Sequence, residues 1–289
     1  MKNALTIDVE DWRQLVYWKM TGEIIPPSPI VVEETRDLLA LLARYNVRAT
    51  MFVLNNIAEA FPELVSEMDR AGHDVASHGL SHRLIYRQTP EEFRDETRRA
   101  KKQLEQILGK PVQGYRAAEF SITRQSWWAM DILAREGFAY DSSIYPIAGS
   151  RYGIPEFSLA PVRVQTDAGA LVEFPLTAIE FAGRRFPVAG GGYFRVLPYA
   201  LTRAAIRAAN RQKRPAVVYL HPYEFSARAL HVPSGTRTRN PIFFFVRYSL
   251  IHNLGRQRLR QRLEQLLHDF EFVPIKELMS SVSIDQAVF

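Results

Sequence analysis

Short apolar stretches of strand length alternate with longer helical stretches through the first half of this chain, and this alternation limits its possible folds. We expect strands at 4–8, 49–54, 73–78, 112–116 and 138–141, and helices at 31–45, 57–71, 89–108 and 124–136. Strands separated by helices are predicted to be parallel and joined by right-handed crossovers. The predicted fold class is therefore α/β, a distorted parallel (β/α) barrel of about seven strands with a small β-rich insertion.

The pattern loosens near residue 146, where prolines, glycines and short strands replace the regular alternation. We interpret 146–195 as a β-rich insertion that faces the site, with 190–195 as its loop. A helix at 197–211 and a buried strand at 216–221 follow. A chain of 289 residues can form one large α/β domain or two smaller ones. We predict a single domain over 1–289 that includes a basic C-terminal extension at about 226–289.

Chemically reactive side chains stand where the predicted strands end. Asp8, His78, Arg116 and Asp141 occupy this position, and His221 ends a later strand. In parallel barrels the reactive groups sit at the ends of the strands. The sequence therefore predicts that one mouth of the barrel collects these side chains.

Carboxylates and imidazoles are also spaced as metal ligands would be. Glu10 and Asp11 follow the first strand, and His78 and His82 are four positions apart. Two such imidazoles can converge on one cation, and a carboxylate from another strand end can complete a three-ligand face. Open positions would remain for water and substrate, as a catalytic metal site requires. The carboxylates and the histidine pair are each weak evidence alone, but their joint appearance supports a metal-dependent hydrolase.

Composition and hydropathy limit the cellular compartments in which we expect the protein. There is no cysteine, which excludes disulfides and thiolate zinc sites and fits a reducing compartment. No stretch approaches the roughly 18 uncharged apolar residues of a membrane span, and no signal peptide is visible. We predict a cytoplasmic protein.

The chain has a net charge of +6, and its largest cluster of arginines lies late in the sequence. The arginines concerned are Arg237, Arg239, Arg247, Arg256, Arg258, Arg260 and Arg262. They are interpreted as a solvated helix face, or as a peripheral contact with anionic membrane lipid, a lipid-linked substrate or an acidic glycan. Nucleic acid is not expected, because no nucleic-acid-binding motif accompanies the charge.

With these elements in place, the chain resembles the polysaccharide deacetylases of carbohydrate esterase family four. Residues 5–8 match the start of the first motif, 78–82 (His-Gly-Leu-Ser-His) the second, 114–118 the third and 219–222 the fifth, while 140–143 match the fourth loosely. The resemblance extends to the branch found with bacterial exopolysaccharide and exosortase gene clusters, because Gly-Gly-Gly-Tyr-Phe-Arg at 190–195 is similar to a loop typical of that branch.

The resemblance implies a hydrolase that removes N-acetyl groups from amino sugars of a polysaccharide or a lipid-linked glycan. Asp8 would be the base, held by Arg116, and His221 the acid, oriented by Asp141. An N-acetylated glycan is the implied substrate, and one divalent metal ion, with zinc as the predicted ion, is the implied cofactor.

The family's metal ligands map onto this sequence with one departure. His78 and His82 match the two histidines of the second motif, whereas Val9 stands where most members carry the metal-binding aspartate. The ligand is then expected to be Glu10, because strand alternation puts it on the side of Asp8, with Asp11 as the second choice.

Aromatic and basic residues near these motifs are predicted to contact substrate. Trp12 and Tyr193 could stack on sugar rings, and Arg195 belongs to the glycine-rich loop. Packing in the core or at the rim explains each aromatic residue equally well.

Two other functions remain open at this point. The altered first motif suggests a metal-independent amidase acting on a small cyclic amide, although such an enzyme has no need of both His78 and His82. A glycan-binding module with a decayed site is the other alternative, and the joint presence of Asp8, Arg116 and His221 argues against it.

Overall fold

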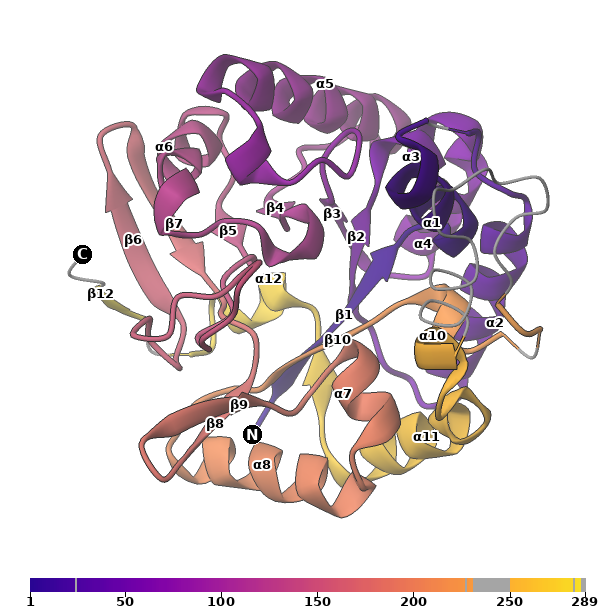
Figure 1. The fold of residues 1–289 in the computed structure, drawn as a ribbon, viewed down its shortest axis with the longest axis vertical. Helices are drawn as coiled ribbons and strands as arrows, with labels where there is room; N and C mark the ends of the chain where they lie inside the picture. Colours follow the sequence, from indigo (N-terminus) through magenta and orange to yellow (C-terminus); the bar gives the residue numbers. More distant parts are fainter. Residues whose placement is uncertain (24, 227, 231–249, 283, 287–289) are drawn as a thin grey trace.

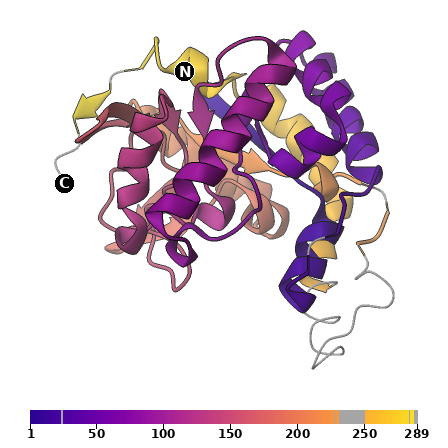
Figure 2. The same cartoon turned by 90° about the horizontal axis from the view of Figure 1, so that it is seen from above.

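Seven parallel strands form the centre of the molecule in the computed structural model, which describes residues 1–23, 25–226, 228–230, 250–282 and 284–286. Figure 1 shows these strands surrounded by helices, and Figure 2 shows helix α5 crossing in front of them. In sheet order they are β10 (Val217–Leu220), β1 (Asn3–Val9), β2 (Thr50–Val53), β3 (Asp74–Ser77), β4 (Gly114–Tyr115), β5 (Tyr140–Asp141) and β7 (Gly169–Glu173). The predicted α/β class and the strongly curled, mostly parallel sheet are confirmed.

The curled sheet is closed by side chains and loops rather than by a full strand ladder. Strand β6 (Val162–Thr166) pairs antiparallel with β7, and β12 (Asp285–Gln286) extends that edge. Between β7 and β10, Thr177 bridges the gap, since its hydroxyl donates to the Val217 carbonyl at 2.9 Å and accepts from the Val217 amide. Strand β11 (Phe272–Val273) adds to β1, and β8 (Ala178–Phe181) with β9 (Arg184–Pro187) forms a separate hairpin.

Helices cover the outside of the sheet. They are α1 (Trp12–Thr21), α2 (Ile30–Arg44), α3 (Asn55–Ala60), α4 (Pro62–Arg70), α5 (Pro90–Leu108), α6 (Trp128–Arg135), α7 (Gly191–Val196), α8 (Tyr199–Arg211), α10 (Ile251–Asn253), α11 (Leu259–Asp269) and α12 (Ile275–Leu278). The predicted capping box at Thr89 and Glu92 is present and begins α5, and Gly109 ends that helix in a left-handed conformation.

Three local features differ from the sequence-based expectations. The helix expected at 57–71 is two helices, because Pro62 begins α4 immediately after α3 ends. The expected loop at 190–195 is largely helix α7. Helix α1 was not predicted, and its Trp12 ring meets the His252 ring of α10 edge-on, with 5.9 Å between the ring centroids.

The basic C-terminal region has an internal structural role in the part that the structure describes. Arg256 is buried and donates to the carbonyls of Tyr223 and Ser226, at 2.6 and 2.8 Å. Arg262 donates to the carbonyl of Phe194 at 2.9 Å, whereas Arg258 and Arg260 are exposed. For Arg256, the expectation of a solvated helix face is therefore wrong. Arg237, Arg239 and Arg247 lie outside the described residues.

Within the described ranges, no helix is both long enough and apolar enough to cross a membrane.

Gly114 allows strands β3, β4 and β5 to be tied together. The Tyr140 ring crosses β4 and its hydroxyl donates to Asp74 on β3 at 2.6 Å. A Cβ atom at position 114 would lie 2.0 Å from that ring. This position therefore requires glycine, and it lies two residues before Arg116.

We expect Gly114→Ala to lower the melting temperature by several degrees, because overpacking in a core typically costs about 1–3 kcal/mol. Gly192→Ala is the control, since a Cβ there meets its nearest neighbour, the Arg195 side chain, at 3.5 Å. Thermal unfolding followed by circular dichroism measures both. Equal melting temperatures for the two variants would contradict the tight approach of Tyr140.

Candidate metal centre and active site

Three buried side chains place their ligand atoms at one point beyond the ends of β1 and β3. Glu10 Oε2 lies 3.1 Å from His82 Nε2 and 3.5 Å from His78 Nε2. One ligand atom from each residue lies within 4.8 Å of the other two. None of the three residues is more than 5% exposed. One carboxylate and two imidazoles facing each other form a donor set that suits a divalent cation.

The backbone around the two histidines holds the His78 ring and turns the chain so that His82 faces the same point. His78 directly follows β3, and its Nδ1 lies 2.9 Å from the Arg116 carbonyl, which leaves Nε2 directed at Glu10. Gly79 has a φ of 83° and His82 a φ of 55°, so the chain turns sharply between the two rings. When one ring nitrogen of a histidine binds a metal, the other usually donates its N–H to a group such as a backbone carbonyl.

Asp11 is directed away from this cluster. Its carboxylate caps helix α1, accepting from the Arg13 amide at 3.0 Å, and it also accepts from the Ser28 amide at 2.5 Å. Burial raises the pKa of this carboxyl, although both backbone bonds oppose that effect. The second choice of carboxylate ligand is therefore corrected: Glu10 joins the histidines and Asp11 is a helix cap.

Asp8 and Arg116 form a buried ion pair beside the cluster. Arg116 Nη1 donates to Asp8 Oδ1 at 2.8 Å, and the arginine is fully buried. The remaining guanidinium bonds go to the Thr6 hydroxyl and to the carbonyl and hydroxyl of Ser142, at 2.7–2.8 Å. Asp8 Oδ2 is left on the side of His221, 3.9 Å from its Nε2.

His221 faces the cluster from the end of β10. Its Nε2 lies 3.5 Å from Glu10 Oε1, and its Nδ1 lies 3.1 Å from Glu224 Oε2. The Tyr223 ring stacks on the imidazole with a centroid distance of 4.9 Å. The histidine is therefore held from behind by a carboxylate and from one face by an aromatic ring.

Asp141 does not orient His221, and that prediction is wrong. The Asp141 carboxylate accepts from the Ser143 hydroxyl at 2.6 Å and the Ser143 amide at 3.2 Å. It also interacts with the buried Glu173, and burial raises the pKa of both carboxyls. Asp141 thus stabilises the loop after β5, whose Ser142 holds Arg116.

Sequence reasoning missed Glu224. This residue stands three positions after His221 and is 1% exposed, in a short 3₁₀ helix (η4, Pro222–Glu224). A signal was available, because proline at the first position of a turn and glutamate at the third resemble a helix start.

The charged groups of the site influence each other strongly. Burial raises the pKa of Glu10, but His82 and His78 outweigh it and hold that pKa well below its usual range. Burial would lower the pKa of His221, yet Glu224, Glu10 and Asp8 together raise it to about 9. Burial would raise the pKa of Glu224. The neighbouring His221 outweighs this effect, so the pKa of Glu224 is lowered. The site thus combines two buried carboxyls of lowered pKa, Glu10 and Glu224, with the His221 imidazole, whose pKa is raised.

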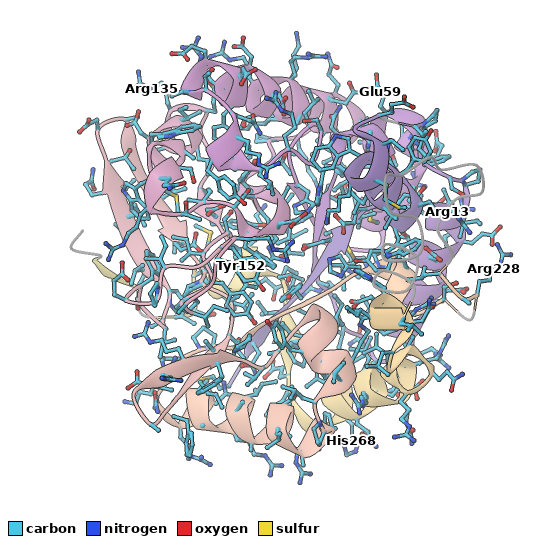
Figure 3. All side chains as sticks on the ribbon, in the orientation of Figure 1. Arg13, Glu59, Arg135, Tyr152, Arg228 and His268 are labelled. Atoms are coloured by element: carbon cyan, nitrogen blue, oxygen red, sulfur yellow. The ribbon has the colours of Figure 1, made fainter. Side chains whose placement is uncertain are left out.

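A cavity of about 380 Å³ opens over these groups and has an aromatic wall. Asp8, Glu10, His78, His82 and His221 form its polar side. Its aromatic lining consists of Trp12, Phe120, Tyr152, Tyr193, Tyr219 and Tyr223. Tyr152 lies near the middle of the face seen in Figure 3, whereas Glu59, Arg135 and His268 lie at its periphery.

The predicted substrate-contacting residues differ in their exposure. Tyr193 is 36% exposed and lines the cavity. Trp12 also lines it but is only 2% exposed and packs with Val16 and Tyr223. Arg195 is 4% exposed, and its Nε lies 3.0 Å from Glu224 Oε1. Arg195 also lines the cavity, and its contact with substrate stays a prediction beside the ion pair that it forms behind His221.

Comparison with known proteins agrees with this geometry. A family model described as polysaccharide deacetylase matches residues 23–136, which contain His78, His82 and Arg116. Residues 23–136 are therefore similar to the polysaccharide deacetylases. A second model, described as a domain of unknown function (DUF3473), matches residues 142–280 and covers Arg195 and His221.

Curated relatives match part of this chain. A chitooligosaccharide deacetylase of Bradyrhizobium sp. (strain ANU 289) is 31% identical over 108 residues, which are 37% of this chain and 46% of the relative. A peptidoglycan deacetylase of Helicobacter pylori is 30% identical over 112 residues, which are 37% of this chain and 36% of the relative. The matched part thus spans less than half the length of either relative.

The fold of the whole chain is also found among solved structures. The crystal structure of a protein assigned to the polysaccharide deacetylases, from Mycobacterium smegmatis, aligns with a TM-score of 0.60 at 20% identity. The alignment covers 99% of this chain and 93% of that one. The likeness extends over both family matches and supports a shared fold.

We expect zinc to raise the melting temperature of the parent protein, because a ligand that binds only the folded state stabilises it by about 2.7 kcal/mol at 100 times its Kd. Glu10→Gln should abolish this zinc-dependent increase, since it removes the only carboxylate of the cluster. Asp11→Asn is the matched control and should keep the increase, because asparagine caps a helix as well as aspartate does. The reverse pattern in a thermal unfolding series would return the ligand role to Asp11.

Proposed function

We propose that this chain is a metal-dependent hydrolase that removes the acetyl group from N-acetylglucosamine units of a glycan. The observation that carries the proposal is the convergence of Glu10, His78 and His82 on one point next to His221, whose Nε2 also faces Asp8. The relatives supply the substrate class, since they are a chitooligosaccharide deacetylase and peptidoglycan deacetylases.

The donor atoms of the cluster fit a divalent cation, and zinc in particular. Glu10 Oε2 is buried and accepts no hydrogen bond from any residue that the structure describes, although two imidazole nitrogens face it. A buried carboxylate oxygen left in this way costs free energy unless a cation or a donor compensates it. Two imidazoles and one carboxylate are the ligands of several catalytic zinc sites. When bound, the ion would polarise the acetyl carbonyl and lower the pKa of water.

Asp8 is proposed as the general base. Arg116 occupies its Oδ1, so Oδ2 remains available to a water molecule in the cavity. Oδ2 takes a proton from this water as the water oxygen forms a bond to the acetyl carbon. The ion pair keeps the carboxylate oriented throughout, and a base placed in this way typically contributes about 10²–10⁴-fold to the rate.

His221 is proposed as the general acid. Its Nε2 is on the same side as Asp8 Oδ2 and Glu10 Oε1, at 3.9 and 3.5 Å. This nitrogen gives its proton to the amide nitrogen as the carbon–nitrogen bond breaks, which releases acetate and a free amino sugar. Because an amine is a poor leaving group without a proton, amide hydrolysis depends on this donor more than ester hydrolysis does.

The aromatic wall is proposed to hold the sugar. Tyr193 is partly exposed and lines the same cavity as Asp8 and His221, so its ring can stack against a pyranose face. Contact with anionic lipid or a lipid-linked substrate remains a prediction, for which the exposed Arg258 and Arg260 are the described candidates.

The two alternative functions receive less support. A metal-independent amidase has no use for a carboxylate buried between two imidazoles. A decayed binding module has no reason to keep a base, a bound arginine and an acid around one cavity.

We expect Asp8→Asn to keep the zinc-dependent increase in melting temperature and to lose about 10²–10⁴-fold in kcat, because an amide does not accept the proton of water. Acetate release from a chitooligosaccharide, with zinc present, measures the loss. The control is Asp37→Asn, a carboxylate on the outer helix α2, which should leave kcat unchanged. A kcat/KM of Asp8→Asn within tenfold of the parent would assign the base role elsewhere.

We expect His221→Ala to lose about 10²–10⁴-fold on an N-acetylated sugar and clearly less on nitrophenyl acetate. A phenolate leaves without protonation, whereas an amine does not. His268→Ala is the histidine control, because its side chain is 85% exposed on helix α11, and it should behave like the parent with both substrates. Equal losses of His221→Ala on amide and ester would show that His221 has a structural role.

A further inference from the structure

We propose that Glu224, backed by Arg195, is the positioning residue of His221, and that the stretch matching the domain of unknown function builds this half of the site. The inference rests on the proposed function, because it takes His221 as the acid. His221, Glu224 and Arg195 all lie within residues 142–280, whereas His78, His82 and Arg116 lie within the other family match.

Glu224 contacts His221 twice with one oxygen. Its Oε2 accepts from the His221 backbone amide at 2.9 Å and lies 3.1 Å from His221 Nδ1. The same carboxylate therefore fixes both the backbone and the ring of the histidine. With Nδ1 donating to Glu224, Nε2 points toward Glu10 and Asp8, where a proton is needed.

The other oxygen of Glu224, Oε1, forms an ion pair with Arg195. Arg195 Nε lies 3.0 Å from Oε1, and both side chains are at most 5% exposed. Glu224 thus faces three donors: a backbone amide, an imidazole Nδ1 and a guanidinium. A carboxylate can accept on both oxygens, whereas an amide has one accepting oxygen and one donating nitrogen. A glutamine at this position would direct its donating amide nitrogen at another donor on one of its two sides, and no hydrogen bond could form there.

The turn that carries Glu224 is held from several directions. Arg256 donates to the Tyr223 carbonyl at 2.6 Å, within the short 3₁₀ helix. Arg262 donates to the carbonyls of Phe194 and Arg195, at 2.9 and 2.5 Å. Gly255 has a φ of 80°, and a Cβ there would lie 2.4 Å from the Arg195 carbonyl. The basic residues of the C-terminal region therefore fix Arg195 and Glu224 relative to each other.

Asp141 is not available for this task. It bonds to Ser143 and faces Glu173 on the other side of Arg116. Among the described residues, Glu224 is the carboxylate that contacts His221 Nδ1, while the two carboxylates near Nε2 are Asp8 and Glu10. The role expected of a strand-end aspartate is thus taken by a glutamate in the turn after β10.

The first test measures whether Glu224 acts through the leaving group. With zinc bound, Glu224→Gln should lower kcat on a chitooligosaccharide by about 10²-fold or more, with little change in KM, and should lower the rate on nitrophenyl acetate clearly less. Glu105→Gln is the matched control, since this carboxylate accepts from the Val112 amide just before β4, at the opposite ends of the strands. Equal losses on amide and ester, or loss of the bound zinc, would overturn the proposal.

A double-mutant comparison tests whether Glu224 acts through His221. In a His221→Ala background, Glu224→Gln should cost less than about a further twofold, because residues that act as one unit are not additive. If the two losses multiply, Glu224 acts independently of His221 and the proposal is wrong.

Nitrogen-15 NMR of histidine-labelled protein gives a readout that needs no activity. The signal of His221, assigned by its loss in His221→Ala, should indicate a protonated Nδ1 in the parent and in Glu105→Gln and should change in Glu224→Gln. An unchanged signal would overturn the positioning role, even if the parent released acetate. If the parent releases no acetate but the signal changes, the proposed function fails while the Glu224–His221 contact stands.

Discussion

The fully buried side chain of Arg116 is the interaction on which the site depends most. Its guanidinium binds Asp8 and its backbone carbonyl holds the ring of His78, so one residue orients both the proposed base and a proposed ligand. A buried ion pair adds little to stability by itself, but removing one partner typically costs about 3–5 kcal/mol. Thr6, Ser142 and the face of the Phe52 ring surround the guanidinium and compensate its loss of water.

The balance of charge explains why the site has two halves. Asp8 and Glu10 lie close together, and Glu224 adds a third buried carboxylate behind His221. Arg116 balances the first and Arg195 balances the third. Among the residues that the structure describes, the partners of Glu10 are imidazoles, and an imidazole is a good metal ligand when it is neutral. A bound cation would therefore complete the charge balance at Glu10, which, unlike Asp8 and Glu224, has no arginine partner among the described residues.

The site residues at strand ends can be predicted from the sequence, whereas the contacts of those in the turns cannot. Asp8, His78 and Arg116 follow apolar stretches of strand length, so their common edge is a consequence of parallel pairing. Glu10 and Asp11 are adjacent in sequence; strand alternation favours Glu10, and Asp11 caps the start of α1 instead of turning toward His78. Arg195 and Glu224 meet through contacts between residues 29 positions apart, and neither residue's own neighbours encode that pairing. Asp141 matched a family motif loosely, and its burial next to Glu173 gave it a different role.

The most direct test of the central claim is acetate release measured against bound metal. Protein stripped with a chelator would be reloaded with zinc in steps and given a chitooligosaccharide, with zinc content and acetate determined on the same samples. Because Glu10, His78 and His82 form one cluster, we expect acetate release to rise in proportion to bound zinc and to level off at about one ion per chain. Undiminished acetate release from metal-free protein, or full zinc loading without any release, would contradict the account.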